Sequence, residues 1–157
     1  MKKILLVILL LSVWVFPYEK AEAAAAAPTP DQKLFVNTST NKMDFYQDGK
    51  FIRRFTVATG KANTPTALGT FIIVNKIKNR PYYTRHIKGG DPRNPLGDRW
   101  LGLNMNKTWG TTYAIHGTNT NTVIGKNTTL GCIRMYNEDI HWLFDRIGEK
   151  ATVVVKK

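Results

Sequence analysis

Short apolar runs, broken at close intervals by glycine, proline and asparagine, constrain the fold of this 157-residue chain most. Runs of this length, rich in β-branched and aromatic residues, predict strands rather than helices. The Asp48-Gly49 dipeptide between two of them is typical of a tight hairpin turn. The expected strands lie within residues 34–36, 43–46, 51–58, 70–74, 100–103, 112–116 and 151–155. We expect those between residues 33 and 74 to form an antiparallel meander.

One segment has a helical period instead. Apolar side chains recur at i, i+3, i+4 and i+7 from Ile140 to Ile147, Asn137 stands where a helix cap is expected, and Gly148 follows. The chain is long enough for one ordinary domain. We therefore predict a mainly β fold, a sandwich or flattened barrel of mixed sheets, with one helix packed on it through this apolar stripe.

Residues 79–98 have no regular period, because three glycines and three prolines interrupt them. An irregular segment of this length in a compact domain is usually functional. We expect it to form a lid or a wall of the substrate site.

The N-terminus has the pattern of a secretory signal peptide. A basic start, an apolar stretch from Ile4 to Phe16 and a small-x-small site ending at Ala23 predict cleavage after residue 23. The apolar stretch is shorter than the ~20 residues that a membrane span needs. We assign 1–23 to the signal, 24–31 to a linker and 32–157 to the catalytic domain. We therefore expect an exported protein without a stable membrane span.

The formal net charge is +12. A strongly basic protein attracts polyanions such as nucleic acid, anionic lipid or acidic wall polymers. Export disfavours nucleic acid, which leaves anionic lipid and wall polymers, and we expect anionic wall polymers as a partner.

A single cysteine, Cys132, calls for an explanation in an exported chain, where it cannot form an internal disulfide. It is either a catalytic thiol or a small buried hydrophobic residue. His116, at the end of an expected strand, is the natural general base, although it too could be a core residue. Three histidines and one cysteine without close spacing disfavour a zinc site, and no cofactor is implied.

The residues beside Cys132 suit acyl transfer. If the segment is extended, Arg134 points to the same side as Cys132, where its charge would favour the thiolate and hold a substrate carboxylate. Gly131 allows close approach of backbone, so that amide N–H groups of Gly131 and Cys132 could face an oxyanion.

These motifs resemble the L,D-transpeptidase catalytic domain, also called the YkuD family, over essentially the whole predicted domain. The resemblance rests on His-Gly-Thr at 116–118 and on Thr-Leu-Gly-Cys-Ile-Arg-Met-Tyr-Asn at 129–137. Further family-like stretches lie at 57–61, 64–71 and 94–103.

The resemblance implies that Cys132 attacks the bond between the diamino acid and D-Ala of a peptidoglycan stem peptide. His116 would be the base, Gly117 and Thr118 would hold its imidazole, and Thr129 would belong to the same site. The thioester would pass to an acceptor amine as a 3→3 cross-link, and we expect a monomer. Leu130 stands where many members have a second histidine, which puts the hydrogen bonding of the cysteine loop in question.

Three other interpretations stay open. A sortase-like transpeptidase has a Thr-Leu-x-x-Cys pattern, which the Thr-Leu-Gly-Cys of residues 129–132 resembles only superficially, and its histidine lies much further from the cysteine. An L,D-carboxypeptidase would use the same thioester with water as acceptor. A wall-binding protein without turnover would keep only the fold and the charge.

Overall fold

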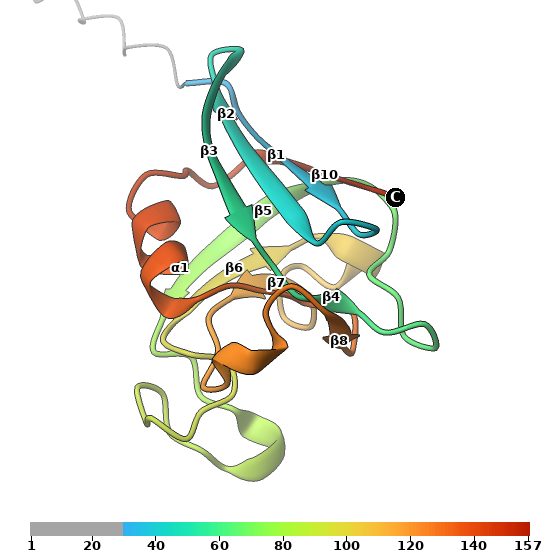
Figure 1. Cartoon of the computed structure of the whole chain (residues 1–157). Coiled ribbons are helices and arrows are strands. Elements are labelled where there is room, and N and C mark those ends of the chain that lie inside the picture. Colours follow the sequence, from blue (N-terminus) through green and yellow to red (C-terminus); the bar gives the residue numbers. More distant parts are fainter. Residues whose placement is uncertain (1–29) are drawn as a thin grey trace, which may run out of the picture.

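The computed structural model describes residues 30–157, so the predicted signal peptide and most of the linker lie outside the described residues. Ten strands and one α-helix, α1 (Asn137–Phe144), follow one another in this part of the chain (Figure 1). The strands are β1 (Gln32–Asn37), β2 (Lys42–Gln47), β3 (Lys50–Thr56), β4 (Thr59–Gly60), β5 (Gly69–Lys78), β6 (Arg99–Leu103), β7 (Ala114–His116), β8 (Asn127–Thr129), β9 (Ile133–Arg134) and β10 (Thr152–Lys156).

Eight strands form one curled mixed sheet in the order β3-β2-β1-β10-β5-β6-β7-β9, and β4 pairs with β8 in a second, small sheet. The pairs β1–β10 and β7–β9 are parallel, and the other pairs of the large sheet are antiparallel. The expected antiparallel meander over residues 33–74 is wrong beyond β3. The last strand, β10, inserts between β1 and β5, because its buried Val153 and Val155 complete the core there.

The predicted hairpin at Asp48-Gly49 joins β2 to β3. Both residues have positive φ, 50° for Asp48 and 74° for Gly49, as a two-residue turn of type I′ requires. The alternation of burial along β1 follows the side-chain period of a half-buried strand. Local sequence therefore determines this part of the sheet.

The helix α1 packs its predicted apolar stripe, Ile140, Leu143 and Phe144, into the core of the sheet. Its predicted cap is wrong. The N-cap position is Tyr136, without a side-chain cap bond, and Asn137 is the first helical residue. The Asn137 side chain instead accepts a hydrogen bond from another loop. The helix also ends at Phe144, before Gly148.

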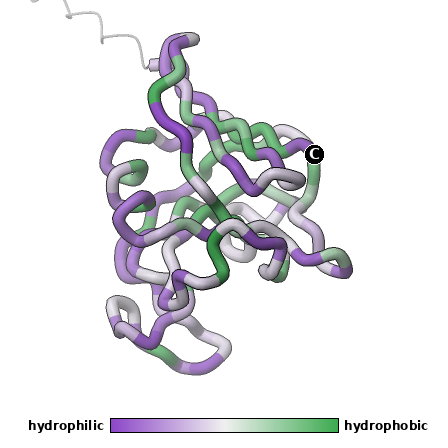
Figure 2. Tube along the Cα trace, viewed as in Figure 1, coloured by the Kyte–Doolittle hydropathy of each residue, from purple (hydrophilic) through white to green (hydrophobic). Residues whose placement is uncertain are grey.

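Together, these elements confirm the predicted class, a mainly β domain of mixed sheets with one helix packed on it. The apolar residues concentrate on the central strands, as Figure 2 shows. Residues 79–98 are irregular, as predicted, apart from a 3-10 turn at Tyr83–Arg85, and they project from the body of the domain (Figure 1). Within residues 30–157, no helix is long and apolar enough to cross a bilayer.

Candidate active site

Two neighbouring parallel strands deliver the predicted catalytic residues. His116 is the last residue of β7 and pairs with Arg134 on β9, while Cys132 directly precedes β9. The crossover between them spans residues 117–131. Parallel pairing therefore brings together residues that are far apart in the sequence.

Cys132, His116, Arg134 and Thr129 line one cleft of about 410 Å³. The projecting segment forms another part of its wall, which includes Arg80 and the exposed Tyr83. The predicted wall of the site thus lies beside the predicted nucleophile. A larger hollow of about 890 Å³ lies over β1, β2 and β10, and it contains none of the predicted site residues.

The imidazole of His116 is held in one orientation. Its Nδ1 lies 2.7 Å from the carbonyl oxygen of Gly117 and 3.3 Å from that of Leu96. Because a carbonyl oxygen can only accept, Nδ1 must carry the proton, and Nε2 keeps its lone pair. Trp100 stacks on the ring, with centroids 5.5 Å apart and planes 19° apart. Such a neutral imidazole is ready to accept a proton at Nε2.

Burial of His116, which is 1% exposed, controls its charge. Burial first, and then the positive charge of Arg134, lowers the pKa of His116 to about 4. The hydrogen bonds to Gly117 and Leu96 oppose this shift only in part. The side chain is therefore neutral at neutral pH.

The half-buried Cys132 thiol lies 3.4 Å from the carbonyl oxygen of Thr112. Burial raises the pKa of Cys132, and the opposing effects of the Ala114 N–H and of the Arg134 and Arg80 charges do not outweigh it. The charge of Arg134 thus lowers the pKa of Cys132, but burial has the larger effect. The resting pair consists of a neutral thiol and a neutral imidazole, so a base must remove the proton during attack.

Thr129 shapes the loop before the cysteine. Its buried hydroxyl donates to the carbonyl oxygen of Cys132 at 2.6 Å and accepts from the N–H of Gly131 at 3.1 Å. The Gly131 N–H is therefore engaged within the loop. Among the residues that the structure describes, the N–H of Cys132 has no acceptor, so it is the better candidate for an oxyanion contact.

Glycine is required at position 131. Its φ is +113°, and a Cβ there would lie 3.0 Å from the ring of Tyr113. Leu130 is 70% exposed at the rim of the cleft. The loop is thus held by Thr129, and the side chain at position 130 is free to contact what enters the cleft.

We expect Thr129→Val to lower the free energy of unfolding by about 1–3 kcal/mol, because two buried backbone groups lose their partner. Urea unfolding measures this difference. The exposed neighbour Thr128 supplies the matched control, Thr128→Val. Equal stability of the two variants would contradict the role given to the Thr129 hydroxyl.

The other predicted residues do not all lie at the cleft. The Gly117 carbonyl oxygen contacts Nδ1 of the His116 imidazole. Thr118 does not line the cleft; it borders a separate hollow, and its N–H donates to Asn137. Trp109, which precedes β7 in the sequence, is 75% exposed and does not line the cleft.

Sequence reasoning missed a stack behind the imidazole. The guanidinium of Arg80 lies 4.2 Å from the ring centroid of Trp100, which in turn stacks on His116. Arg80 also donates to the carbonyl oxygen of Thr111 at 2.8 Å. In the sequence, only the position of Arg80 in the irregular segment 79–98 indicated that it could lie at the site. Trp100 is buried, and through its stack on His116 it also supports the base.

Comparison with known proteins identifies the family of the chain. The L,D-transpeptidase catalytic domain, YkuD, matches residues 31–155. YqjB of Bacillus subtilis, named provisionally as an L,D-transpeptidase, is 40% identical over 129 residues, which cover 82% of this chain and 73% of YqjB. YkuD of Bacillus subtilis, also provisionally named, is 34% identical over 124 residues, or 79% of this chain and 65% of that protein.

Among solved structures, a mutant of the Enterococcus faecium L,D-transpeptidase with serine in place of a cysteine superposes with a TM-score of 0.64 at 21% identity. The match covers 80% of this chain and 50% of the enterococcal chain. L,D-transpeptidase 3 of Mycobacterium tuberculosis superposes with a TM-score of 0.65 at 17% identity, and the match covers 82% of this chain and 62% of the mycobacterial chain. At these identities the likeness concerns the fold.

Proposed function

The chain belongs to the L,D-transpeptidase catalytic-domain family, and we propose that it is a cysteine acyltransferase acting on peptidoglycan stem peptides. One observation carries this proposal: Cys132 lines a single cleft with a neutral imidazole whose Nδ1 is held by backbone carbonyls.

Acylation begins with attack of the Cys132 sulfur on the carbonyl carbon between the diamino acid and D-Ala. The thiol proton passes to Nε2 of His116 as the C–S bond forms. The Cys132 N–H and the charge of Arg134 stabilise the developing oxyanion. When the intermediate collapses, the C–N bond breaks, Nε2 returns the proton to the leaving amine, and D-Ala departs from a thioester.

The second half-reaction transfers the acyl group. His116 takes a proton from the side-chain amine of an acceptor stem, which attacks the thioester carbonyl and releases the Cys132 thiol. The product is a 3→3 cross-link. Water in place of the amine would give a tripeptide, as in an L,D-carboxypeptidase, and acylation would be identical.

The proposed setting is outside the membrane, in the cell wall, with the protein acting as an exported monomer. The net charge of the full chain is +12, and the predicted signal peptide carries only +1 of it, so the exported protein stays strongly basic, which supports an added attraction to anionic wall polymers. Binding to isolated walls should therefore weaken as salt is raised, since screening shortens the reach of surface charges. Binding that does not depend on salt would remove this partner from the proposal.

The acid limb of the pH profile is a second expected result. His116 must be neutral to act as base, and its pKa is lowered to about 4, so kcat/KM should fall only as the pH drops toward about 4. An ordinary imidazole would lose activity near pH ~6.5. Initial rates from pH 3.5 to 8, with circular dichroism to verify folding, measure the midpoint. A midpoint between 6 and 7 would contradict the neutral, buried base.

Incubation of the mature protein with purified disaccharide-tetrapeptide, followed by mass spectrometry of the products, tests the function itself. Dimers that have lost one D-Ala support transpeptidation. Tripeptide monomers alone would identify a carboxypeptidase. If folded protein leaves the substrate unchanged, the wall-binding interpretation replaces the enzyme.

A further inference from the structure

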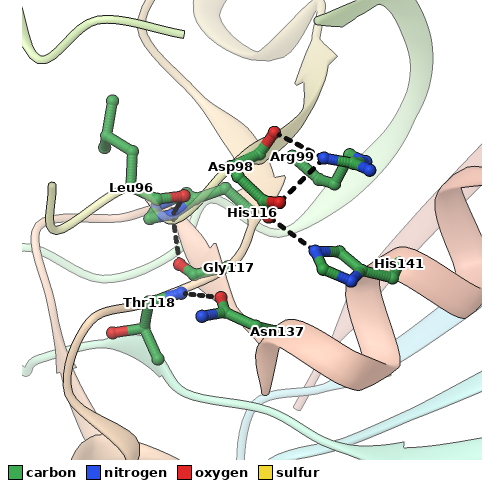
Figure 3. A network of polar contacts seen from close by, with 8 residues as sticks. All are labelled: Leu96, Asp98, Arg99, His116, Gly117, Thr118, Asn137 and His141. Atoms are coloured by element: carbon green, nitrogen blue, oxygen red, sulfur yellow. Dashed lines mark hydrogen bonds and ion pairs between the residues drawn. The ribbon is translucent and has the colours of Figure 1, made fainter. Parts of the chain in front are cut away.

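The peptide group between Gly117 and Thr118 is hydrogen-bonded at both ends (Figure 3). Its carbonyl oxygen accepts from Nδ1 of His116 at 2.7 Å. Its N–H donates to Oδ1 of Asn137 at 2.9 Å. Because a peptide group is planar and rigid, the contact at one end fixes the direction of the other. Asn137 and His116 are thus linked through one peptide plane.

Close packing determines where the Asn137 amide lies. A Cβ on Gly117 would come 2.3 Å from Asn137 Oδ1, and a Cβ on Gly97 would come 2.8 Å from the same atom. The amide oxygen therefore sits in a space that two glycines leave open. A longer or bulkier side chain at any of these three positions would displace the peptide group.

The contact has no evident role in the helix itself. Asn137 is the first residue of α1, the N-cap is Tyr136, and the helix has no side-chain cap bond. The Asn137 oxygen faces the 117–118 backbone instead. Its effect is therefore on the loop that carries the carbonyl acceptor of the base.

We propose that Asn137 is a positioning residue of the general base: it fixes the Gly117–Thr118 peptide group, and through it the orientation of the His116 ring. This inference rests on the proposed function. An acceptor at the N–H end also polarises the peptide, so that its carbonyl oxygen becomes a better acceptor. The effect is largest when His116 holds the proton of Cys132, since a hydrogen bond from a charged donor is stronger.

The same helix face also contacts the segment that carries the second carbonyl. His141, one turn after Asn137, has its Nε2 2.6 Å from Oδ1 of Asp98. Asp98 lies two residues after Leu96, whose carbonyl oxygen is the longer contact of Nδ1, at 3.3 Å. Asn137 acts on the shorter contact, so its replacement should have the larger effect.

The ring nitrogens of His116 give a direct test that does not need turnover. Long-range proton–nitrogen spectra of ¹⁵N-histidine protein separate the Nδ1–H from the Nε2–H tautomer, and His86→Gln helps to assign the three histidines. We expect the wild type to show Nδ1–H alone. Asn137→Ala should show a mixture or exchange broadening, and its kcat should fall about tenfold with KM within about twofold.

Three further variants sharpen the test. Asn137→Asp keeps an acceptor oxygen at the same reach and should retain the Nδ1–H tautomer and kcat within about threefold. Asn137→Gln moves the oxygen by one methylene and should behave like alanine, so it replaces Asn137→Ala if that variant fails to fold. Asn119→Ala is the matched control, because the Asn119 side chain donates to the carbonyl of Arg93 on the surface.

An unchanged tautomer and unchanged kcat in folded Asn137→Ala would overturn the proposal. A uniform loss in all the variants, including Asn119→Ala, would also overturn it, because it would indicate a general loop effect. If the wild type lacks turnover, the proposed function fails. The ring-nitrogen spectra would still decide the positioning role.

Discussion

Cys132→Ala is expected to lower product formation from disaccharide-tetrapeptide by about a thousandfold or more, because no other side chain in the cleft can form the thioester. The half-buried thiol contacts backbone groups, the carbonyl oxygen of Thr112 and the N–H of Ala114, so the fold should tolerate the change. Rates are measured by mass spectrometry of the products. Thermal unfolding of the same preparation verifies that the variant is folded.

Cys132→Ser is the stricter companion variant, because it keeps the shape and the contact to Thr112 while replacing sulfur with a far weaker nucleophile. We expect the same loss of turnover. Residual activity above one tenth of wild type in either variant would show that the acyl group is carried elsewhere.

His116→Gln is expected to lower kcat/KM by about 10²–10⁴-fold, the usual contribution of a positioned general base. The loss should be largest at neutral pH, where burial keeps the Cys132 thiol protonated. His86→Gln is the matched control, since His86 is exposed on the projecting segment. The measurement is kcat/KM at pH 7 for the wild type, His116→Gln and His86→Gln.

Alkylation of Cys132 by iodoacetamide distinguishes a missing base from a damaged site. At high pH the thiol ionises without a base, so folded His116→Gln should react at a rate close to that of the wild type. At pH 7 it should react more slowly. Equal rates at pH 7 would mean that His116 does not act on Cys132.

Local sequence predicted the strands well, because alternation of apolar and polar residues is a local property. The Asp48-Gly49 turn shows this, since its positive φ values follow from residue type. The place of β10 between β1 and β5 could not be predicted in the same way. Pairing between the first and last strands depends on contacts across more than a hundred residues, which no local period records.

Rare residue types allowed part of the candidate site to be predicted. The prediction failed for residues whose role depends on contacts in the folded chain. A single cysteine and a histidine at a strand end identified Cys132 and His116 as candidates, and the structure places both in one cleft. Asn137 was misread as a helix cap, because the sequence does not show which N–H its oxygen accepts. The stack of Arg80 on Trp100 was missed for the same reason.

Mass spectrometry of the intact protein during early turnover tests the central claim most directly. Wild-type protein is mixed with disaccharide-tetrapeptide, quenched in acid within seconds to minutes, weighed, and digested to locate any adduct. The account predicts an adduct equal to the substrate minus D-Ala, on the peptide that contains Cys132 and absent from Cys132→Ala. Release of D-Ala by folded protein with no adduct on Cys132, or with an adduct on another residue, would contradict it.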